Sequence, residues 1–275
     1  MLDFLKAKGA QTVYKNTLKY TITEANGLYL TYIWVSNPYR QMGVALAGYP
    51  TGLAYVSDTM AREIPASTNK AYVAVNASTF VGGGYNERYY EDIPGWYNTT
   101  ESSYLINRGV VIHNFSEIFD RNNTKNLGLA KDGYLKDYAF SAVNGSLEQS
   151  VLAKNIERNR GLITKMNNDG IQNSFTAFAT VLSKKGAVSS STDISARTGL
   201  CQVDRNNFIL LSSRGCSYNE MGQTFKNLGC YVGYNLDGGG STSFVYQSNG
   251  TQVDYYGDVL GLGLREVADA LYFTE

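Results

Sequence analysis

The pattern of hydrophobic and polar positions predicts a chain built mainly from β-strands. Hydrophobic and polar residues alternate over 17–23, whereas 27–35 and 71–76 are almost continuous runs of apolar, β-branched and aromatic residues. Alternation is typical of a strand with one buried face, and a short continuous run is typical of a strand buried on both faces. Between the second and third of these strands, the pattern over 53–63 predicts a helix.

The C-terminal part of the chain carries the most regular pattern. Turn residues separate apolar runs there, and the predicted strands span 174–183, 199–204, 207–212, 231–236 and 241–247. Ser217 and Glu220 have the spacing of a capping box at a helix N-terminus, and Gly229 marks a helix end. We therefore expect a helix over 217–228.

The middle of the chain is less regular. Residues 82–107 are rich in glycine, tyrosine and asparagine, which is typical of a long functional loop. A hairpin is predicted over 105–113, and a surface helix is predicted over 146–160, ended by Gly161. The polar, turn-rich composition of 115–170 indicates an insertion.

Together these elements predict the α+β class: a mixed, mostly β sheet with a few packed helices, in a single catalytic domain. Residues 66–275 are expected to form this domain, with the insertion at about 115–170. Residues 1–65 are expected either to add strands to it or to form an N-terminal β-rich attachment module.

Composition and charge exclude several classes of partner. The chain has 24 basic and 24 acidic side chains and no basic stripe, which argues against nucleic acid. No apolar run is long enough to span a bilayer and no signal peptide is found, so we expect no membrane insertion and a cytoplasmic location when the protein is made. The 22 tyrosines suit strands and also surfaces that hold sugars or proteins.

Cysteine and histidine content restricts the chemistry. Cys201, Cys216 and Cys230 are odd in number and widely spaced, which predicts buried thiols rather than a disulfide framework or a zinc site. Because His113 is the only histidine, a multi-histidine metal centre is impossible and a His-dependent triad is disfavoured.

The run from Asn235 to Thr242, Asn-Leu-Asp-Gly-Gly-Gly-Ser-Thr, points most directly to chemistry. Asp237 closes a predicted buried strand, and the glycines after it let a ligand approach the main chain closely. Successive N–H groups in such a turn can bind an anion, and Ser241 and Thr242 add hydroxyl donors. The alternative is a hairpin turn, since Asp-Gly and Gly-Gly turns commonly join adjacent strands.

This run resembles the signature of the phosphodiester glycosidase family. Further segments resemble that family in the same order along the chain: 74–80 with Asn76, 196–200 with Arg197, Glu220, and 265–271 with Arg265. The resemblance covers about residues 70–275. It departs from the family pattern where Ala77-Ser78-Thr79 replaces a small-glycine run.

The resemblance implies a hydrolase that cleaves a sugar-1-phosphodiester bond in a glycan or a phosphate-bearing cell-surface polymer such as a teichoic acid. Because the leaving phosphate is already acidic, one carboxylate as base or nucleophile and one cation for the phosphate suffice. No cofactor is required. A divalent cation held by Asp204, Asp237 and Asp254 is compatible with the sequence but not demanded by the chemistry.

The resemblance also assigns the site. Asp237 is the predicted catalytic carboxylate, and Glu220 is the second, with helix capping as its alternative. Arg197 is the predicted phosphate clamp because a guanidinium binds two phosphate oxygens in a fixed fork, and a structural ion pair is its alternative. The other predicted substrate- or phosphate-binding residues are Asn76, Asn235, Gly238, Gly239, Gly240, Ser241, Thr242 and Arg265.

A second class of function stays open. Residues 1–65 combine turns, strands and tyrosine in a manner similar to phage tail proteins, which would make the protein a virion component in contact with other virion proteins. A non-catalytic glycan-binding or structural tail module on the same fold is therefore the alternative. The joint presence of Asp237, Glu220 and Arg197 favours the enzyme.

Overall fold

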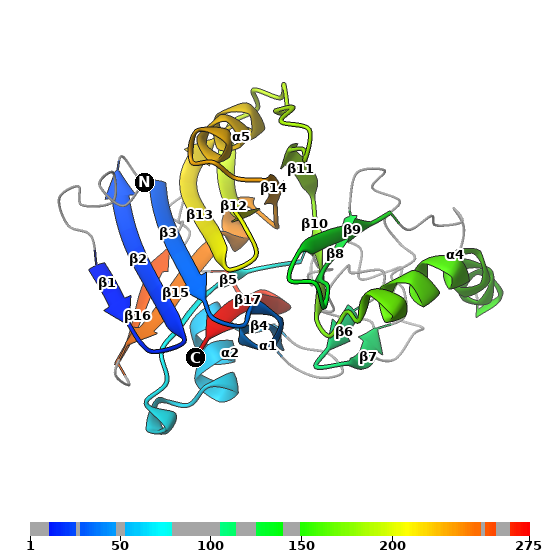
Figure 1. Cartoon of the computed structure of the whole chain (residues 1–275), viewed down its shortest axis with the longest axis horizontal. Helices are drawn as coiled ribbons and strands as arrows, with labels where there is room; N and C mark the ends of the chain where they lie inside the picture. The colour runs from blue at the N-terminus through cyan, green and yellow to red at the C-terminus, as the bar shows by residue number, and fades with distance from the viewer. Residues whose placement is uncertain are drawn as a thin grey trace.

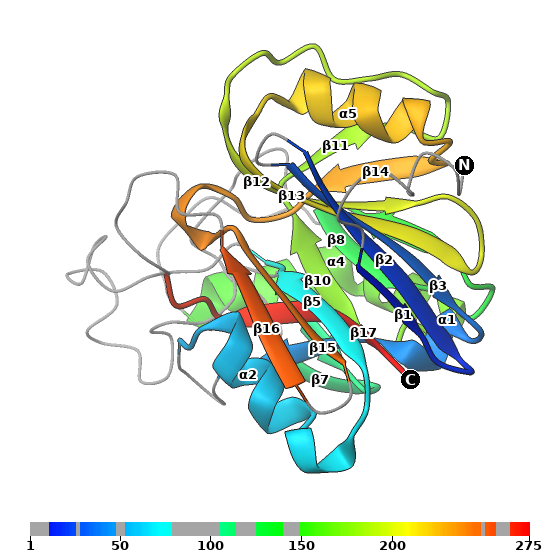
Figure 2. The same cartoon turned by 90° about the vertical axis from the view of Figure 1, so that its left-hand side faces the viewer.

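The computed structural model describes residues 11–25, 28–47, 53–78, 105–113, 125–139, 149–248, 251–256 and 265–275. Most strands in these ranges belong to two sheets that lie face to face, with the main hydrophobic core between them (Figures 1 and 2). Neighbouring strands within both sheets run antiparallel.

In spatial order, the larger sheet consists of β1 (Gln11–Tyr14), β2 (Leu18–Ala25), β3 (Leu28–Val35), β13 (Asn207–Cys216), β12 (Ser195–Gln202), β14 (Val232–Asn235) and β11 (Ala179–Leu182). The smaller sheet consists of β16 (Thr251–Tyr256), β15 (Ser243–Ser248), β5 (Tyr72–Asn76), β17 (Asp269–Thr274) and β4 (Met42–Leu46). A third sheet and a hairpin contain β10 (Ser174–Ala177), β8 (Lys125–Leu129), β9 (Leu135–Tyr138), β6 (Leu105–Asn107) and β7 (Val110–His113). The helices are α1 (Pro38–Gln41), α2 (Val56–Glu63), α4 (Gln149–Asp169) and α5 (Tyr218–Asn227), with the 3-10 turns η2 (Ala66–Thr68) and η3 (Gly239–Ser241).

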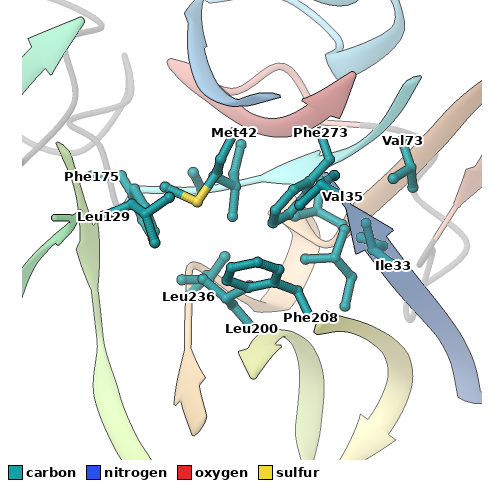
Figure 3. Close-up of a cluster of buried hydrophobic side chains, with 14 of the residues drawn as sticks. Ile33, Val35, Met42, Val73, Leu129, Phe175, Leu200, Phe208, Leu236 and Phe273 are labelled. Carbon is teal, nitrogen blue, oxygen red and sulfur yellow. The ribbon is translucent and has the colours of Figure 1, made fainter. Parts of the chain in front are cut away.

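The main core is made of apolar side chains from both large sheets, with Leu129 and Phe175 of the third sheet packed at one end (Figure 3). Phe208 of β13 and Phe273 of β17 are fully buried, and their ring centroids lie 5.0 Å apart across the interface. Leu200 and Val73, one from each sheet, are also fully buried. Burying a side chain of this size stabilises the fold by ~1.5–3 kcal/mol, so this layer holds the two sheets together.

One helix covers the outer face of each large sheet. Met60 of α2 packs against the smaller sheet, and Phe225 of α5 packs against the larger one. A Cβ at Gly233 would lie 2.5 Å from the Phe225 ring, and one at Gly199 would lie 2.9 Å from it. Glycine at these two strand positions therefore lets α5 lie close to the sheet, which fixes the helix N-terminus near the start of β12.

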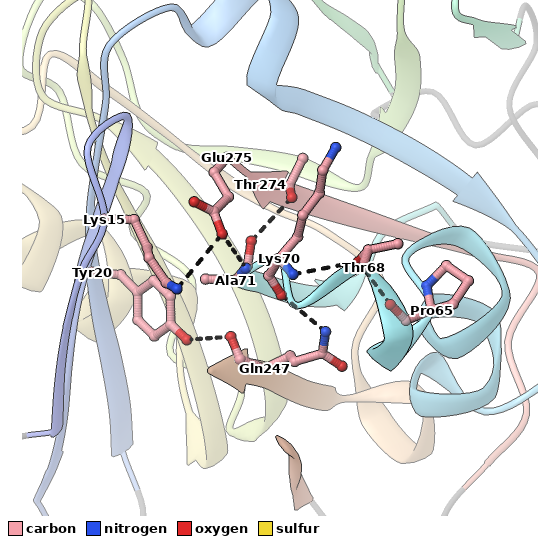
Figure 4. A network of polar contacts seen from close by, with 9 residues as sticks. All are labelled: Lys15, Tyr20, Pro65, Thr68, Lys70, Ala71, Gln247, Thr274 and Glu275. Carbon is pink, nitrogen blue, oxygen red and sulfur yellow. Dashed lines mark hydrogen bonds and ion pairs between the residues drawn. The ribbon is translucent and has the colours of Figure 1, made fainter. Parts of the chain in front are cut away.

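Polar contacts also join the two sheets at the beginning of β5 (Figure 4). The hydroxyl of Tyr20 in the larger sheet donates to the carbonyl of Gln247 in the smaller one over 2.9 Å. Burial raises the pKa of Tyr20, which keeps this hydroxyl protonated as a donor. The carboxylate of Glu275 accepts the Ala71 N–H over 2.8 Å and lies 4.0 Å from the Lys15 ammonium.

The fold class predicted from the sequence is confirmed: the protein is mostly β, with a few helices packed on the sheets. The strands predicted over 17–23, 27–35 and 71–76 correspond to β2, β3 and β5. Within residues 1–65, β1, β2 and β3 extend the larger sheet and β4 extends the smaller one. No helix in the described ranges is long and apolar enough to cross a membrane.

The largest differences between predicted and observed boundaries fall in two elements. The strand predicted over 174–183 is two strands, β10 and β11, which belong to different sheets and are separated by Phe178. The helix predicted to stop at Gly161 continues as α4 to Asp169. An interior glycine costs a helix about 1 kcal/mol, and the burial of Met166 beyond it offsets that cost. Residues 146–148, where the helix was expected to begin, lie outside the described ranges.

The cysteine prediction is also corrected. Cys201 and Cys230 form a disulfide, and Cys216 is a buried free thiol. The pair was not visible in the sequence because the two residues are 29 positions apart. They meet only because β12 lies beside β14, which begins soon after Cys230.

Candidate active site

The segment between β14 and β15 joins the two large sheets. β14 belongs to the larger sheet and β15 to the smaller one, and residues 236–242 cross between them through η3. A hairpin turn would join neighbouring strands of one sheet, so the hairpin alternative for Asp-Gly-Gly-Gly is wrong. The crossover instead carries Asp237 past the end of β5 and the start of β12.

Asp237 is fixed through both of its backbone polar groups. Its N–H donates to the carbonyl of Ala77 over 2.9 Å, and its carbonyl accepts from the side-chain amide of Asn76 over 2.8 Å. Its half-buried carboxylate accepts the N–H of Gly238 over 2.9 Å. A carboxylate held in this way has few orientations available, as a group that acts on one defined atom requires.

Asn76 lies inside the protein and connects four segments. Its side-chain carbonyl accepts the Thr198 hydroxyl over 2.7 Å and the Ser243 N–H over 3.0 Å. One amide thereby joins β5, β12, β15 and the crossover. Asn76 has no exposed surface, and its side chain positions Asp237. Its predicted substrate-binding role stays a prediction.

The glycines of the crossover differ in what they permit. A Cβ on Gly238 would lie 2.7 Å from the Ala196 carbonyl oxygen, so glycine lets the crossover lie against β12. Gly239 has φ +60° and faces open space. In the part of the chain that the structure describes, the N–H groups of Gly239 and Gly240 donate no hydrogen bond. These two donors are therefore available to an anion.

The polar side chains that flank the glycines are buried. Asn235, Ser241 and Thr242 are 1%, 2% and 2% exposed. The carbonyl of Ser241 accepts the Ser243 hydroxyl over 2.8 Å, and the carbonyl of Asn235 accepts the Phe178 N–H over 2.8 Å. In this structure the three residues pack inside the crossover, and their predicted phosphate-binding role stays a prediction.

Arg197 of β12 lies beside this crossover, because a Cβ on Gly238 would lie 3.7 Å from the Arg197 Cα. Its Nε donates to the Cys216 carbonyl over 3.3 Å, and its Nη2 donates to the Asp193 carbonyl over 3.0 Å. Among the described residues it forms no ion pair with a carboxylate, so the structural ion pair considered from the sequence is not found. The guanidinium keeps its charge and further N–H donors for a phosphate.

Tyr218, the first residue of α5, is a site residue that the sequence pattern did not indicate. The guanidinium carbon of Arg197 lies 4.1 Å from the centroid of its ring, a cation–π contact. Burial raises the pKa of Tyr218, the Arg197 cation opposes this rise, and the Asp237 carboxylate adds to it. Both charged groups therefore lie near the Tyr218 hydroxyl, which stays protonated. The signal that locates Tyr218 is the capping box, which fixes where α5 begins.

Glu220 completes that capping box. Its carboxylate accepts the backbone N–H of Ser217 over 2.8 Å and the Ser217 hydroxyl over 2.9 Å. These two hydrogen bonds hold the pKa of Glu220 below its ordinary range, so the carboxylate is ionised at neutral pH. The structure therefore shows the capping alternative, while a catalytic role for Glu220 stays a prediction.

Arg265 lies next to the crossover. The Arg265 side chain is exposed, and its Cδ lies 3.8 Å from the position that a Cβ of Gly240 would occupy. A second cation therefore borders the free N–H groups.

The candidate metal ligand Asp204 does not join Asp237: its carboxylate accepts N–H groups of Asn206 and Asn207 in a turn. Within the described ranges, no group of three or more acidic, cysteine or histidine residues gathers as metal ligands would.

The residues of the candidate site lie within the part of the chain that matches a known protein family. The model of a family described as phosphodiester glycosidase matches residues 69–274. The chain is similar to the catalytic domain of zebrafish N-acetylglucosamine-1-phosphodiester alpha-N-acetylglucosaminidase, auto-inhibited by its pro-peptide, with a TM-score of 0.54, 16% identity, and coverage of 98% of this chain and 85% of that one. It is also similar to a hypothetical protein from Synechocystis, with a TM-score of 0.60, 14% identity, and coverage of 98% and 64%. At these identities the two structures show a shared fold. No curated protein matches the sequence significantly.

Proposed function

Because the chain belongs to the phosphodiester glycosidase family, we propose that it hydrolyses a sugar-1-phosphodiester bond in a glycan or in a phosphate-bearing cell-surface polymer. The observation that carries the proposal is the pairing of two groups at the crossover. The Asp237 carboxylate is immobilised there, and the Arg197 guanidinium, which forms no ion pair with the described carboxylates, lies beside it. Together they supply the anion and the cation that the reaction needs.

The reaction breaks the bond between the anomeric carbon and a phosphate oxygen. Water supplies the hydroxyl that the sugar gains, and its proton goes to the solvent or to the phosphomonoester. Asp237 acts on the anomeric carbon, as a base towards that water or as a nucleophile that water later displaces. Its backbone hydrogen bonds to Asn76 and Ala77 hold the carboxylate in place during this step.

The phosphate is held by positive and N–H groups on both sides of the crossover. Arg197 offers a two-pronged donor, and the free N–H groups of Gly239 and Gly240 offer two more. Arg265 adds charge next to Gly240. Donors that are fixed before the substrate binds stabilise the departing phosphate without reorganisation, and such stabilisation accounts for much of the rate enhancement in many enzymes.

The test is the release of free sugar together with UDP from UDP-N-acetylglucosamine, or together with a phosphomonoester from an N-acetylglucosamine-1-phosphodiester. Wild type should release both, and Asp237→Asn should lower the rate by about 10²–10⁴-fold. Circular dichroism should show the same fold for both proteins, because the backbone hydrogen bonds of residue 237 do not involve its side chain. Equal activity of the two proteins would remove Asp237 from the mechanism.

No release by either folded protein, with this substrate and with phosphate-bearing polymers, would overturn the proposed hydrolysis. That outcome would favour a glycan-binding module on the same fold.

A further inference from the structure

Two exposed tyrosines form a pair on a surface away from Asp237. Tyr134, between β8 and β9, is 39% exposed, and Tyr231, just before β14, is 44% exposed. Their ring centroids lie 6.1 Å apart in an edge-to-face arrangement. The other exposed tyrosines of the described ranges, Tyr14 and Tyr55, have no such ring partner. A pair of large rings left in water is unusual enough to call for an explanation.

A buried glutamine holds the backbone on both sides of this pair. Gln202 of β12 has no exposed surface. Its side chain donates to the Gly133 carbonyl over 2.7 Å and accepts the Leu135 N–H over 2.8 Å, so it brackets Tyr134. Its backbone carbonyl accepts the Tyr231 N–H over 2.8 Å. One residue therefore fixes the chain at both tyrosines.

Covalent and steric restraints act at the same place. The disulfide joins Cys201, next to Gln202, to Cys230, next to Tyr231. Gly133 has φ +86°, and the Arg205 side chain covers the space where its Cβ would be. Both rings are thus exposed but held on a rigid backbone. Rigid, exposed tyrosines provide a large contact area at a small cost in conformational entropy, which is typical of binding surfaces.

The charge beside the rings favours an anionic ligand. The Lys184 ammonium lies 5.8 Å from the centroid of the Tyr231 ring and forms no ion pair with the residues that the structure describes. The acidic residues of the neighbouring hairpin are each paired with a lysine, Asp132 with Lys136 and Asp137 with Lys125. A ligand with apolar sugar faces and a phosphate would match the rings and Lys184 together.

We propose that Tyr134, Tyr231 and Lys184 form a second binding surface for a phosphate-bearing glycan chain, separate from the site at Asp237. Tyr231 precedes β14 and Asp237 follows it, so they lie at opposite ends of this strand, roughly 15–20 Å apart at ~3.3 Å per residue. A polymer of several units could occupy both places, whereas a single sugar phosphodiester could not. The nature of the ligand rests on the proposed function.

The experiment measures binding and hydrolysis separately. The probes are a polymer of N-acetylglucosamine units joined through 1-phosphodiesters and its single repeating unit. Binding of the polymer is measured by calorimetry in the Asp237→Asn background, so that it is not cut. Tyr134→Ala, Tyr231→Ala and Lys184→Gln should each raise the Kd for the polymer by about 2- to 10-fold. Hydrolysis of the single unit, measured with Asp237 intact, should be unchanged in all three.

Matched variants control for exposure and folding. Tyr14→Ala removes a tyrosine that is 72% exposed and should leave the Kd unchanged. Tyr134→Phe keeps the ring and should retain most of the binding, which would show that the alanine variant lost a contact rather than its fold. An unchanged Kd in the Tyr134→Ala/Tyr231→Ala double variant, or no binding of the polymer by the parent protein, would overturn this inference.

A different result would contradict the proposed hydrolysis. If neither the single unit nor the polymer is cut, the proposed function is wrong. Polymer binding that still depends on Tyr134 and Tyr231 would then support the second surface alone.

Discussion

The side-chain amide of Asn76 donates to the backbone carbonyl of Asp237 over 2.8 Å, which ties the end of a strand in one sheet to the crossover that leaves the other. The same side chain accepts two further hydrogen bonds, from Thr198 and Ser243. The position of the candidate catalytic carboxylate thus depends on a residue with no exposed surface.

Asn76→Ala should reduce both stability and activity. It leaves the Asp237 carbonyl, the Thr198 hydroxyl and the Ser243 N–H without their partner, and each unsatisfied buried group costs about 1–3 kcal/mol. Asn173→Ala is the matched control, because Asn173 is 9% exposed and also makes two hydrogen bonds to the backbone, at Arg108 and Met42. Denaturation curves and the activity of the folded fraction check this. Only Asn76→Ala should lower the activity per folded molecule.

Arg197→Lys should lower kcat/KM by about 10- to 100-fold, because an ammonium keeps the charge but loses the two-pronged hydrogen bonding. Arg160→Lys, at an exposed position of α4, should have no effect. Steady-state kinetics on a sugar-1-phosphodiester measures both. Full activity of Arg197→Lys would mean that the guanidinium does not bind the phosphate.

The Tyr218 ring should matter more than its hydroxyl. Tyr218→Phe keeps the surface on which Arg197 stacks, whereas Tyr218→Leu removes it. We expect KM to rise by about 2- to 30-fold in the leucine variant, corresponding to ~0.5–2 kcal/mol for a cation–π contact. The phenylalanine variant should stay close to wild type. A larger loss in the phenylalanine variant would instead assign a catalytic role to the hydroxyl.

Glu220→Gln should keep most of the activity and change how stability depends on pH. Because hydrogen bonds from Ser217 lower the pKa of Glu220 in the folded protein, its carboxylate contributes stability above its ordinary pKa of 4.5. That contribution is lost as the pH falls through the lowered pKa, so wild type and variant should converge in acid. Chemical denaturation at several pH values measures this. Lost activity at unchanged stability would make Glu220 catalytic.

Removing the disulfide should destabilise the protein. Cys201 and Cys230 are 29 positions apart, and closing a loop of this length stabilises a fold by about 3–4 kcal/mol on the chain-entropy model. Urea denaturation of Cys201→Ala/Cys230→Ala measures the loss. Thiol titration of the unreduced, denatured wild type should find Cys216 alone reactive, and three reactive thiols would contradict the pairing.

The sequence by itself predicted most of the strands in the two large sheets and the residues of the candidate site. Buried strands such as β3 and β5 follow from continuous apolar runs, and α5 follows from the capping box at Ser217 and Glu220. The Asp237-Gly-Gly-Gly run was recognisable because glycines next to a carboxylate are a local pattern. Local patterns can be recognised from the sequence, because the residues that form them are neighbours along the chain.

The tertiary structure decided how these pieces are used. Three features depend on strand pairings between segments far apart in the sequence. Residues 236–242 cross between the sheets, Asn76 points inward, and Tyr218 stacks on Arg197. The same holds for the Cys201–Cys230 bond and for the split between β10 and β11. Periodicity reports which face of an element is buried, but it carries no information about which other element buries it.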